Sequence, residues 1–269
     1  MDIPKIGLGT WGMGGKYEKD PSNYEESIRT LKAGLELGFR LIDTAELYGQ
    51  GLAEEIIGQA IKNFKREDIF IISKVWKDNL EYDAVIKAAK NSLKRLGSGY
   101  IDLYLIHWSL ENPLAKETPL SETMRALEYL VKMKLVRYIG VSNANVKLLK
   151  EAERNLSRIK LAANQIEYNL INHEADKEII PYCKKNSIKV IAYRPLAKGK
   201  LANLEHEIIK SLAKKYKKTP IQIALNWIIS KDIIPIPGVA KIEHLAENYG
   251  ALGWKLEVND IELIDNLTY

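Results

Sequence analysis

Four residues near the ends of three apolar runs carry the chemistry that this sequence offers. Asp43 and Tyr48 follow one run, Lys74 lies within a second, and His107 ends a third. A lysine inside an apolar strand loses its hydration unless it is paired, and Asp43 is the expected partner. An ammonium group near a phenol favours the phenolate, so we expect Lys74 to lower the pKa of Tyr48 from its usual value of about 10. His107 would supply a neutral N–H or a proton to a carbonyl oxygen.

These side chains together form an acid that protonates an oxygen while another group attacks the carbonyl carbon. The sequence offers no nucleophile–base pair and no metal-ligand spacing for that attack, and a hydride from a nicotinamide would fit. Each residue also has a structural interpretation. Asp43 can cap a turn, Tyr48 can pack, Lys74 can form a structural ion pair, and His107 can be a core histidine.

Composition and charge are those of an ordinary globular protein. The chain has 269 residues, 46% hydrophobic and 28% charged, with a formal net charge of +5. The lysines are scattered, so we expect no nucleic-acid partner. The single cysteine, Cys183, excludes an internal disulfide and is expected to be packed. The histidines lack metal-ligand spacing, and no apolar run approaches the length of a membrane span, so we expect no metal, no membrane contact and a cytoplasmic monomer or weak homo-oligomer.

Strands and helices alternate along the whole chain. Eight strands are predicted at 6–10, 41–42, 69–75, 101–107, 136–142, 162–166, 188–193 and 233–236. Helices are predicted at 22–37, 53–64, 82–96, 120–133, 146–155, 176–186 and 241–251, and from residues 205, 220 and 259. No linker divides the series, which predicts a single-domain (β/α)8 TIM barrel over residues 1–269. Periodicity cannot show closure, so a doubly wound sheet stays open as the alternative.

A glycine-rich turn follows the first predicted strand. It contains Gly7-x-Gly9-x-x-Gly12, which formally matches a dinucleotide fingerprint. That fingerprint needs a helix to open at the glycines, whereas the first helix start is a capping box of Ser22 and Glu25. The glycines are better interpreted as a close approach of backbone to a ligand, or as a tight bend.

Motifs at successive strand ends resemble those of the aldo-keto reductase family. They are DTAELYG, ISKVW, LIHW, IGVSN, NQIEYN, AYRPL and IPIPG with AEN beyond it, and the match runs over essentially the whole chain. The resemblance implies a TIM barrel that binds NADP(H) without a Rossmann domain and reduces aldehydes and ketones to alcohols. It assigns Tyr48 as the general acid, Lys74 and Asp43 as the groups that tune it, and His107 as the residue that orients the carbonyl.

The resemblance also implies cofactor and substrate contacts. Hydrogen bonds to the nicotinamide carboxamide and stacking on its ring would come from Ser142, Asn143, Gln165 and Tyr193, and adenine contacts from Glu247 and Asn248. Three tryptophans that follow different strands would line the substrate pocket: Trp11, Trp76 and Trp108. Trp227 and Trp254, outside any motif, are expected in the core.

The sequence departs from the family after the last strand. Gly238 stands where many members have a lysine, and His244 stands where many have an arginine, which leaves Lys241 as the candidate for the 2′-phosphate of NADPH. We therefore expect NADPH, with NADH possible as a second cofactor. The segment after the final predicted helix is short, and so is the one after His107, which predicts an open site with broad activity on small or aromatic carbonyl compounds.

Two functional alternatives remain on the sequence alone. A nicotinamide-binding regulatory subunit with little turnover is known among members of the family, although the four candidate catalytic residues are all present here. A Schiff-base aldolase could use Lys74 on a barrel strand, but it leaves Gln165 and Tyr193 without a role.

Overall fold

Eight parallel strands, paired in chain order, form the centre of the molecule. The structure is a computed structural model that describes residues 1–107, 118–199, 206–239 and 241–267. The strands are β1 (Leu8–Gly9), β2 (Leu41–Asp43), β3 (Phe70–Trp76), β4 (Ile101–His107), β5 (Val136–Ser142), β6 (Ala163–Glu167), β7 (Lys189–Tyr193) and β8 (Ile233–Ile236). All eight predicted strands are confirmed, with ends that differ by a few residues.

The sheet closes on itself between β8 and β1. The Gly7 N–H donates to Pro235 O at 3.0 Å, and the Gly9 N–H donates to Pro237 O at 2.9 Å. The predicted barrel is therefore confirmed and the doubly wound sheet is excluded. A Cβ on Gly9 would lie 3.0 Å from Ile236 O, so the seam is tight enough to favour glycine there.

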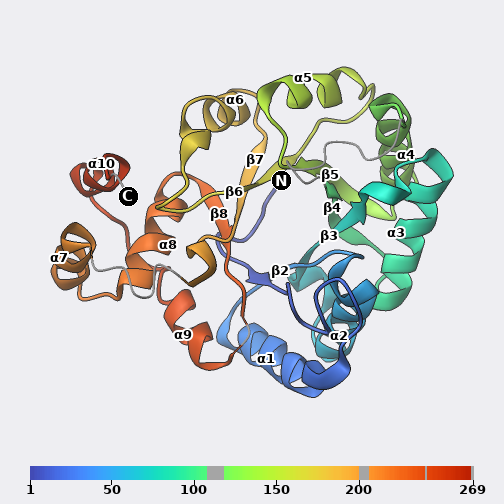
Figure 1. The fold of residues 1–269 in the computed structure, drawn as a ribbon. Coiled ribbons are helices and arrows are strands. Elements are labelled where there is room, and N and C mark those ends of the chain that lie inside the picture. The colour runs from blue at the N-terminus through green and yellow to red at the C-terminus, as the bar shows by residue number, and fades with distance from the viewer. Residues whose placement is uncertain (108–117, 200–205, 240, 268–269) are drawn as a thin grey trace.

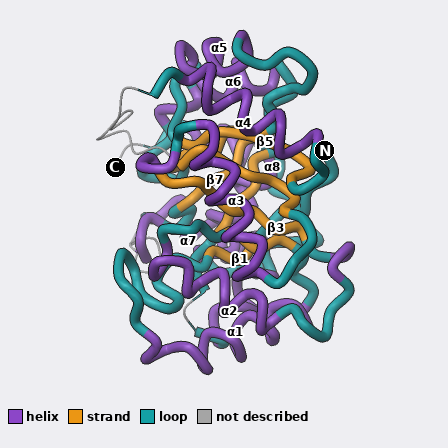
Figure 2. Tube along the Cα trace, turned by 90° about the vertical axis from the view of Figure 1, so that its right-hand side faces the viewer, coloured by secondary structure: helices purple, strands orange, loops and turns teal. Residues whose placement is uncertain are grey.

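Helices surround the strands, as Figures 1 and 2 show from two directions. They are α1 (Tyr24–Leu37), α2 (Leu52–Ala60), α3 (Tyr82–Leu96), α4 (Leu120–Lys132), α5 (Val146–Arg154), α6 (Ile179–Lys185), α7 (Glu207–Tyr216), α8 (Pro220–Ser230), α9 (Glu243–Tyr249) and α10 (Val258–Asp265). None of these helices is both long and apolar enough to cross a membrane.

The predicted capping box at Ser22 is wrong. A short 3-10 turn, Pro21–Asn23, precedes α1, and Asp20 is its N-cap because the Asp20 carboxylate accepts from the Ser22 N–H. Aspartate is as good a cap as serine, and Pro21 suits the first position of the turn. The helix itself begins only at Tyr24, well beyond the glycines, as the rejection of the dinucleotide fingerprint requires.

Side chains that alternate along the strands fill the inside of the barrel. The inward-facing cluster is Leu41, Phe70, Ile72, Leu103, Leu105, Ala163, Ile191, Ile234 and Ile236. Met1 and Ile3 pack against this cluster, so the first residues of the chain cover it at the N-terminal end of the barrel. The polar side chains Asp43, Lys74 and Gln165 come at or near the other end of their strands. An apolar floor therefore lies beneath the predicted site.

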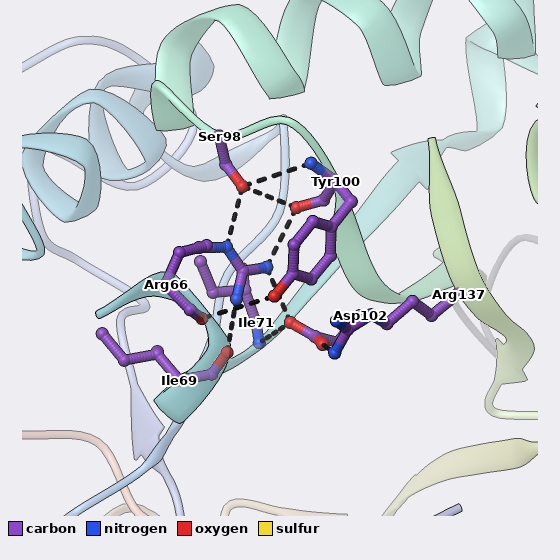
Figure 3. A network of polar contacts seen from close by, with 7 residues as sticks. All are labelled: Arg66, Ile69, Ile71, Ser98, Tyr100, Asp102 and Arg137. Carbon is purple, nitrogen blue, oxygen red and sulfur yellow. Dashed lines mark hydrogen bonds and ion pairs between the residues drawn. The ribbon is translucent and has the colours of Figure 1, made fainter. Parts of the chain in front are cut away.

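An ion-pair network around the buried carboxylate of Asp102 lies at the N-terminal end of the barrel (Figure 3). Asp102 of β4 accepts from Arg66 at 2.6 Å, from Arg137 at 3.0 Å and from the Ile71 N–H at 2.9 Å. Both guanidinium carbons lie 4.0 Å from the centre of the Tyr100 ring. The network therefore joins β3, β4 and β5 at the end of the barrel where TIM-barrel residues usually serve stability.

The remaining structural predictions for isolated residues also hold. Cys183 is buried, and burial raises the pKa of its thiol to about 12, so it is a packed residue and not a nucleophile. Trp227 is buried and stacks on Tyr168, and Trp254 packs partly buried against the core.

Candidate active site

Lys74 is the centre of the predicted catalytic group. Its ammonium Nζ donates to Asp43 Oδ1 at 2.7 Å, to the Thr44 carbonyl at 2.8 Å and to Tyr48 Oη at 3.3 Å. Those three bonds use all three donors of the group, which is fully buried. The predicted pairing of Lys74 with Asp43 is confirmed. Residues 31 positions apart in the sequence meet because β2 and β3 are adjacent and parallel.

The Lys74 ammonium and the Asp43 carboxyl group form a buried ion pair, with 2.7 Å between nitrogen and oxygen. Burial alone would lower the pKa of Lys74, but Asp43 and Tyr48 outweigh it, and the pKa is raised. Burial raises the pKa of Asp43 against the effect of Lys74. The second Asp43 oxygen accepts from Gln165 Nε2 at 2.7 Å, so donors meet both oxygens, as a carboxylate requires. A Schiff-base lysine needs a lowered pKa, so these contacts count against the aldolase alternative.

Tyr48 differs from its prediction in the direction of its pKa shift. The phenol is buried, and burial raises its pKa, outweighing the opposite effect of Lys74. The predicted lowering is therefore wrong for the structure as it stands, because the depth of the site was not visible in the sequence. A raised pKa keeps the phenol protonated throughout the neutral range. Lys74 still lies where it would stabilise a phenolate once the proton has left.

His107 ends β4 beside Tyr48. Burial and the charge of Lys74 lower its pKa to about 3, so the imidazole is neutral at pH 7. The rings of Tyr48 and His107 lie 5.8 Å apart between centroids. Its Nδ1 is buried and lacks a hydrogen-bond partner among the residues that the structure describes. Of the two roles left open in the sequence, a neutral N–H donor is the one that this site supports.

The turn after β2 presents Tyr48 to Lys74. Gly49, Gln50 and Gly51 all have positive φ, at 54°, 52° and 90°, and α2 begins immediately after them. A Cβ on Gly49 would lie 2.1 Å from Gly14 O, so only glycine permits this contact between the two glycine-containing turns. The Gly49 N–H donates to Lys16 O at 2.8 Å. The glycine-rich segment after β1 therefore packs directly on the Tyr48 turn.

Glu46 is a residue of this site that the sequence interpretation missed. Its carboxylate accepts from the Trp76 N–H at 2.6 Å and from Asn79 Nδ2 at 3.0 Å. These bonds join the Tyr48 turn to the segment that follows β3. The signal available in the sequence was a carboxylate two positions before Tyr48, which alternation alone does not distinguish from a solvated residue.

Two of the three predicted pocket tryptophans lie against the catalytic group. Trp11 packs edge-on to Tyr48 at 4.9 Å between ring centroids, and Trp76 packs edge-on to His107 at 5.1 Å. Trp108 lies outside the described residues, as does most of the segment that follows it. Two aromatic walls therefore flank the phenol and the imidazole.

The predicted nicotinamide contacts lie on the ends of three adjacent strands. Ser142 pairs in register with Gln165, and the Tyr193 hydroxyl donates to Asn143 Oδ1 at 2.9 Å. The Tyr193 ring is half-buried at the end of β7. A hydroxyl and two side-chain amides beside a half-buried aromatic ring are the groups that a planar ring bearing a carboxamide needs. These residues fit a nicotinamide next to the Lys74 cluster.

The predicted contacts to the rest of the cofactor lie elsewhere. Lys241 is exposed just before α9, and Glu247 and Asn248 are within α9, which packs against α1 and α8. Asn248 is buried, whereas Glu247 is half-buried. The structure thus places these three residues in or just before α9, and their roles stay predictions.

Arg194 adds a cation that the sequence interpretation did not assign. It follows Tyr193 with a φ of 49°, and its guanidinium pairs with Glu167 at 2.9 Å. The positive charge of Arg194 acts to lower the pKa of Tyr48, against the effect of burial. Arg194 is therefore close enough to the phenol to influence it electrostatically. The side chain is exposed at the mouth of the barrel.

Comparison with known proteins shows the family to which this chain belongs. A profile of the aldo/keto reductase family matches residues 5–268. The chain belongs to the aldo-keto reductase family. As an aldo-keto reductase it is an NAD(P)H-dependent oxidoreductase, and the family resemblance of its motifs is confirmed. Among the described residues, no group of three or more histidine, cysteine, aspartate or glutamate side chains is arranged to hold a metal ion.

Curated relatives of this aldo-keto reductase include two bacterial enzymes. Methylglyoxal reductase YeaE of Escherichia coli strain K12 is 35% identical over 269 residues, covering 98% of this chain and 91% of the relative. Glyoxal reductase of Bacillus subtilis strain 168 is 35% identical over 273 residues, covering 99% of this chain and 90% of the relative.

Solved structures of other aldo-keto reductases share the fold. The thermostable aldo-keto reductase Tm1743, in complex with the inhibitor epalrestat, superposes with a TM-score of 0.90 at 40% identity, over 98% of this chain and 94% of the other. An aldo-keto reductase of Klebsiella pneumoniae in complex with NADPH superposes with a TM-score of 0.87 at 34% identity, over 98% and 90%.

Proposed function

We propose that this aldo-keto reductase uses NADPH to reduce small aldehydes and α-dicarbonyl compounds, aromatic aldehydes among them, with Tyr48 as the general acid. The observation that carries the proposal is the buried chain of contacts from Asp43 through Lys74 to Tyr48. The activities of the methylglyoxal and glyoxal reductases support the substrate class, and the NADPH complex of the Klebsiella enzyme supports the cofactor.

The proposed mechanism follows from the protonation states of the side chains. When bound, NADPH supplies a hydride to the carbonyl carbon. The neutral His107 imidazole donates a hydrogen bond to the carbonyl oxygen and fixes its position beside Tyr48. As negative charge develops on that oxygen, the protonated phenol of Tyr48 donates its proton to it and the alcohol is formed.

Lys74 and Asp43 act on Tyr48 and not on the substrate. An alkoxide is a much stronger base than a phenolate, so even a phenol of raised pKa transfers its proton readily. The Tyr48 phenolate that remains is stabilised by the Lys74 ammonium 3.3 Å away, and Asp43 holds that ammonium in place. A proton from water then restores the phenol.

Ser142, Asn143, Gln165 and Tyr193 are proposed to hold the nicotinamide. The three polar side chains would hydrogen-bond its carboxamide, and the Tyr193 ring would stack against one face. That stacking decides which face of the ring is turned towards the carbonyl. Glu247 and Asn248 would contact the adenine, and Lys241 the 2′-phosphate.

The test is the oxidation of NADPH with methylglyoxal and with benzaldehyde, by wild type and by Tyr48→Phe. We expect the variant to bind NADPH as wild type does and to lose roughly 10²–10⁴-fold in kcat, the range of a general acid. A Tyr48→Phe variant that keeps most of its turnover would refute the acid assignment. A wild type that binds NADPH but reduces no carbonyl compound would favour the regulatory alternative.

A further inference from the structure

A row of aromatic rings leads outwards from the proposed general acid. The Trp11 ring contacts Tyr48 edge-on and also contacts Tyr17 edge-on, the latter at 5.3 Å between centroids and an interplanar angle of 75°. Exposure rises along the row: Tyr48 is 8% exposed, Trp11 is 42% exposed and Tyr17 is 64% exposed. The row therefore runs from the buried acid to solvent.

Several contacts fix the loop that carries Tyr17. Asn23 donates from Nδ2 to Gly12 O at 2.9 Å and accepts from the Gly14 N–H at 2.8 Å. The Asp20 N–H donates to Gly14 O at 2.8 Å. Residue 16, immediately before Tyr17, accepts from the Gly49 N–H in the Tyr48 turn. The backbone on which Tyr17 stands is thus bonded to the turn that holds the acid.

These contacts show which structural role the glycine-rich segment has, and the sequence alone did not specify that role. Gly12, Gly14 and Gly15 all have positive φ, which folds the chain back sharply after Trp11. The reversal places the Tyr17 ring against Trp11. An exposed tyrosine by itself needs no explanation, but one that extends an aromatic wall of the active site does.

We propose that Tyr17 forms the outer wall of the carbonyl pocket and selects substrates whose carbonyl carries an extended planar group, such as a bicyclic aryl group. The inference rests on the proposed function, since it assumes that the carbonyl lies at Tyr48. A small dicarbonyl compound at Tyr48 ends before the outer rings. A single aryl ring reaches Trp11, and a second fused ring reaches Tyr17, where two aromatic faces gain from contact.

The experiment compares three aldehydes of increasing length: methylglyoxal, benzaldehyde and 2-naphthaldehyde, each with NADPH. The variants are Tyr17→Ala, Tyr17→Phe and, as a matched control, Glu18→Ala, which truncates a neighbouring exposed side chain. For Tyr17→Ala we expect KM for 2-naphthaldehyde to rise about three- to tenfold, the range for one lost aromatic contact. We expect less than about a twofold change with benzaldehyde and none with methylglyoxal.

The two other variants separate the ring from its surroundings. Tyr17→Phe keeps the ring and should match wild type on all three aldehydes, as should Glu18→Ala. A uniform loss on all three substrates would mean that Tyr17 only supports the loop, and an unchanged KM for 2-naphthaldehyde would also refute the proposal. Failure of the proposed function looks different, because wild type would then reduce none of the three.

Discussion

The two ends of the barrel each hold a buried aspartate paired with a cation, and they differ in what else the cation contacts. At the N-terminal end, Asp102 lies between Arg66 and Arg137 and also accepts from a backbone N–H. Guanidinium groups stay protonated in proteins, so the two cations of this network are fixed charges.

At the C-terminal end, the cation is a lysine and its third donor goes to a phenol. Lys74 donates one hydrogen bond to Asp43 and a second to the Thr44 carbonyl. Its third hydrogen bond goes to Tyr48, whose phenol can lose a proton. A point charge on a flexible stem can follow that change, whereas the planar Arg66 guanidinium is held by several separate acceptors. Under the proposed mechanism, a buried ion pair takes part in catalysis when its cation contacts a titratable group that a substrate can reach.

Replacing the cation at each end gives the largest expected difference. We expect Lys74→Met to lower kcat by roughly 10²-fold or more, because the phenolate loses its stabilising charge. It should also lower the free energy of unfolding by about 3–5 kcal/mol, because Asp43 is left buried without its cation. Arg66→Met should destabilise the fold as well, yet keep kcat within about twofold, since it touches no proposed catalytic residue. Urea unfolding and NADPH oxidation at 25 °C measure the two quantities.

A folded Arg66→Met protein that had lost its activity would break the comparison. So would a folded Lys74→Met protein that kept its activity. Lys74→Arg separates charge from geometry in the same assays, because it keeps the cation and replaces the ammonium by a larger planar group. We expect it to recover more stability than activity.

Much of this site could be predicted because parallel strands bring their ends together. Once residues 41–42, 69–75 and 101–107 are recognised as neighbouring strands, the meeting of Asp43, Lys74 and His107 follows from topology. The order of the strands alone is enough to predict that these three residues lie close together. The barrel itself follows from the number and regularity of the strand–helix units.

Other features depend on quantities that a sequence does not display. The pKa of Tyr48 is a balance between burial and the Lys74 charge, and its sign depends on depth. Asp20, and not Ser22, is the N-cap of the 3-10 turn that precedes α1, although aspartate and serine are equally good N-cap residues. The position of Tyr17 depends on three glycine conformations and on Asn23, none of which a periodicity reveals.

We expect acid to lower the folding stability of the protein, because His107 at the C-terminal end of the barrel is held in its neutral form. Its folded-state pKa of about 3 lies below the ordinary value of about 6.5, so the unfolded chain binds this proton first as pH falls. Stability from this group is therefore present above pH 6.5 and is lost progressively down to about pH 3, by at most roughly 1.4 kcal/mol per pH unit. His107→Gln removes the titrating group. We expect its Tm relative to wild type to improve steadily between pH 7 and pH 4.

The matched measurement at the other end uses Arg66→Met, which removes no group that titrates in this range. Its Tm difference from wild type should change less between pH 7 and pH 4 than that of His107→Gln. A His107→Gln variant whose Tm stays parallel to wild type would show that the pKa of His107 is not lowered in the folded protein. The imidazole would then be protonated below about pH 6.5, and the proposed neutral N–H donor would be confined to higher pH.

The smallest effect should come from a cation added outside the barrel, where water screens it. Gly238 follows β8, its φ lies outside the left-handed region, and an added Cβ would meet nothing within 4 Å among the described residues. A lysine there can be accommodated without strain, near the segment that leads to Lys241. We expect Gly238→Lys to raise the preference for NADPH over NADH by about 1.5- to fivefold, as one exposed charge contact would.

Gly238→Gln separates the effect of charge from that of side-chain length. It adds a long neutral side chain and should leave the preference for NADPH over NADH unchanged. The gain from Gly238→Lys should also shrink as ionic strength rises, because the contact is exposed. Steady-state KM values for both cofactors at low and high salt measure this. An equal gain for NADH, or a gain from the glutamine, would place the 2′-phosphate elsewhere. The buried Lys74 pair, by contrast, should respond little to salt, since it lies beyond the reach of counterions.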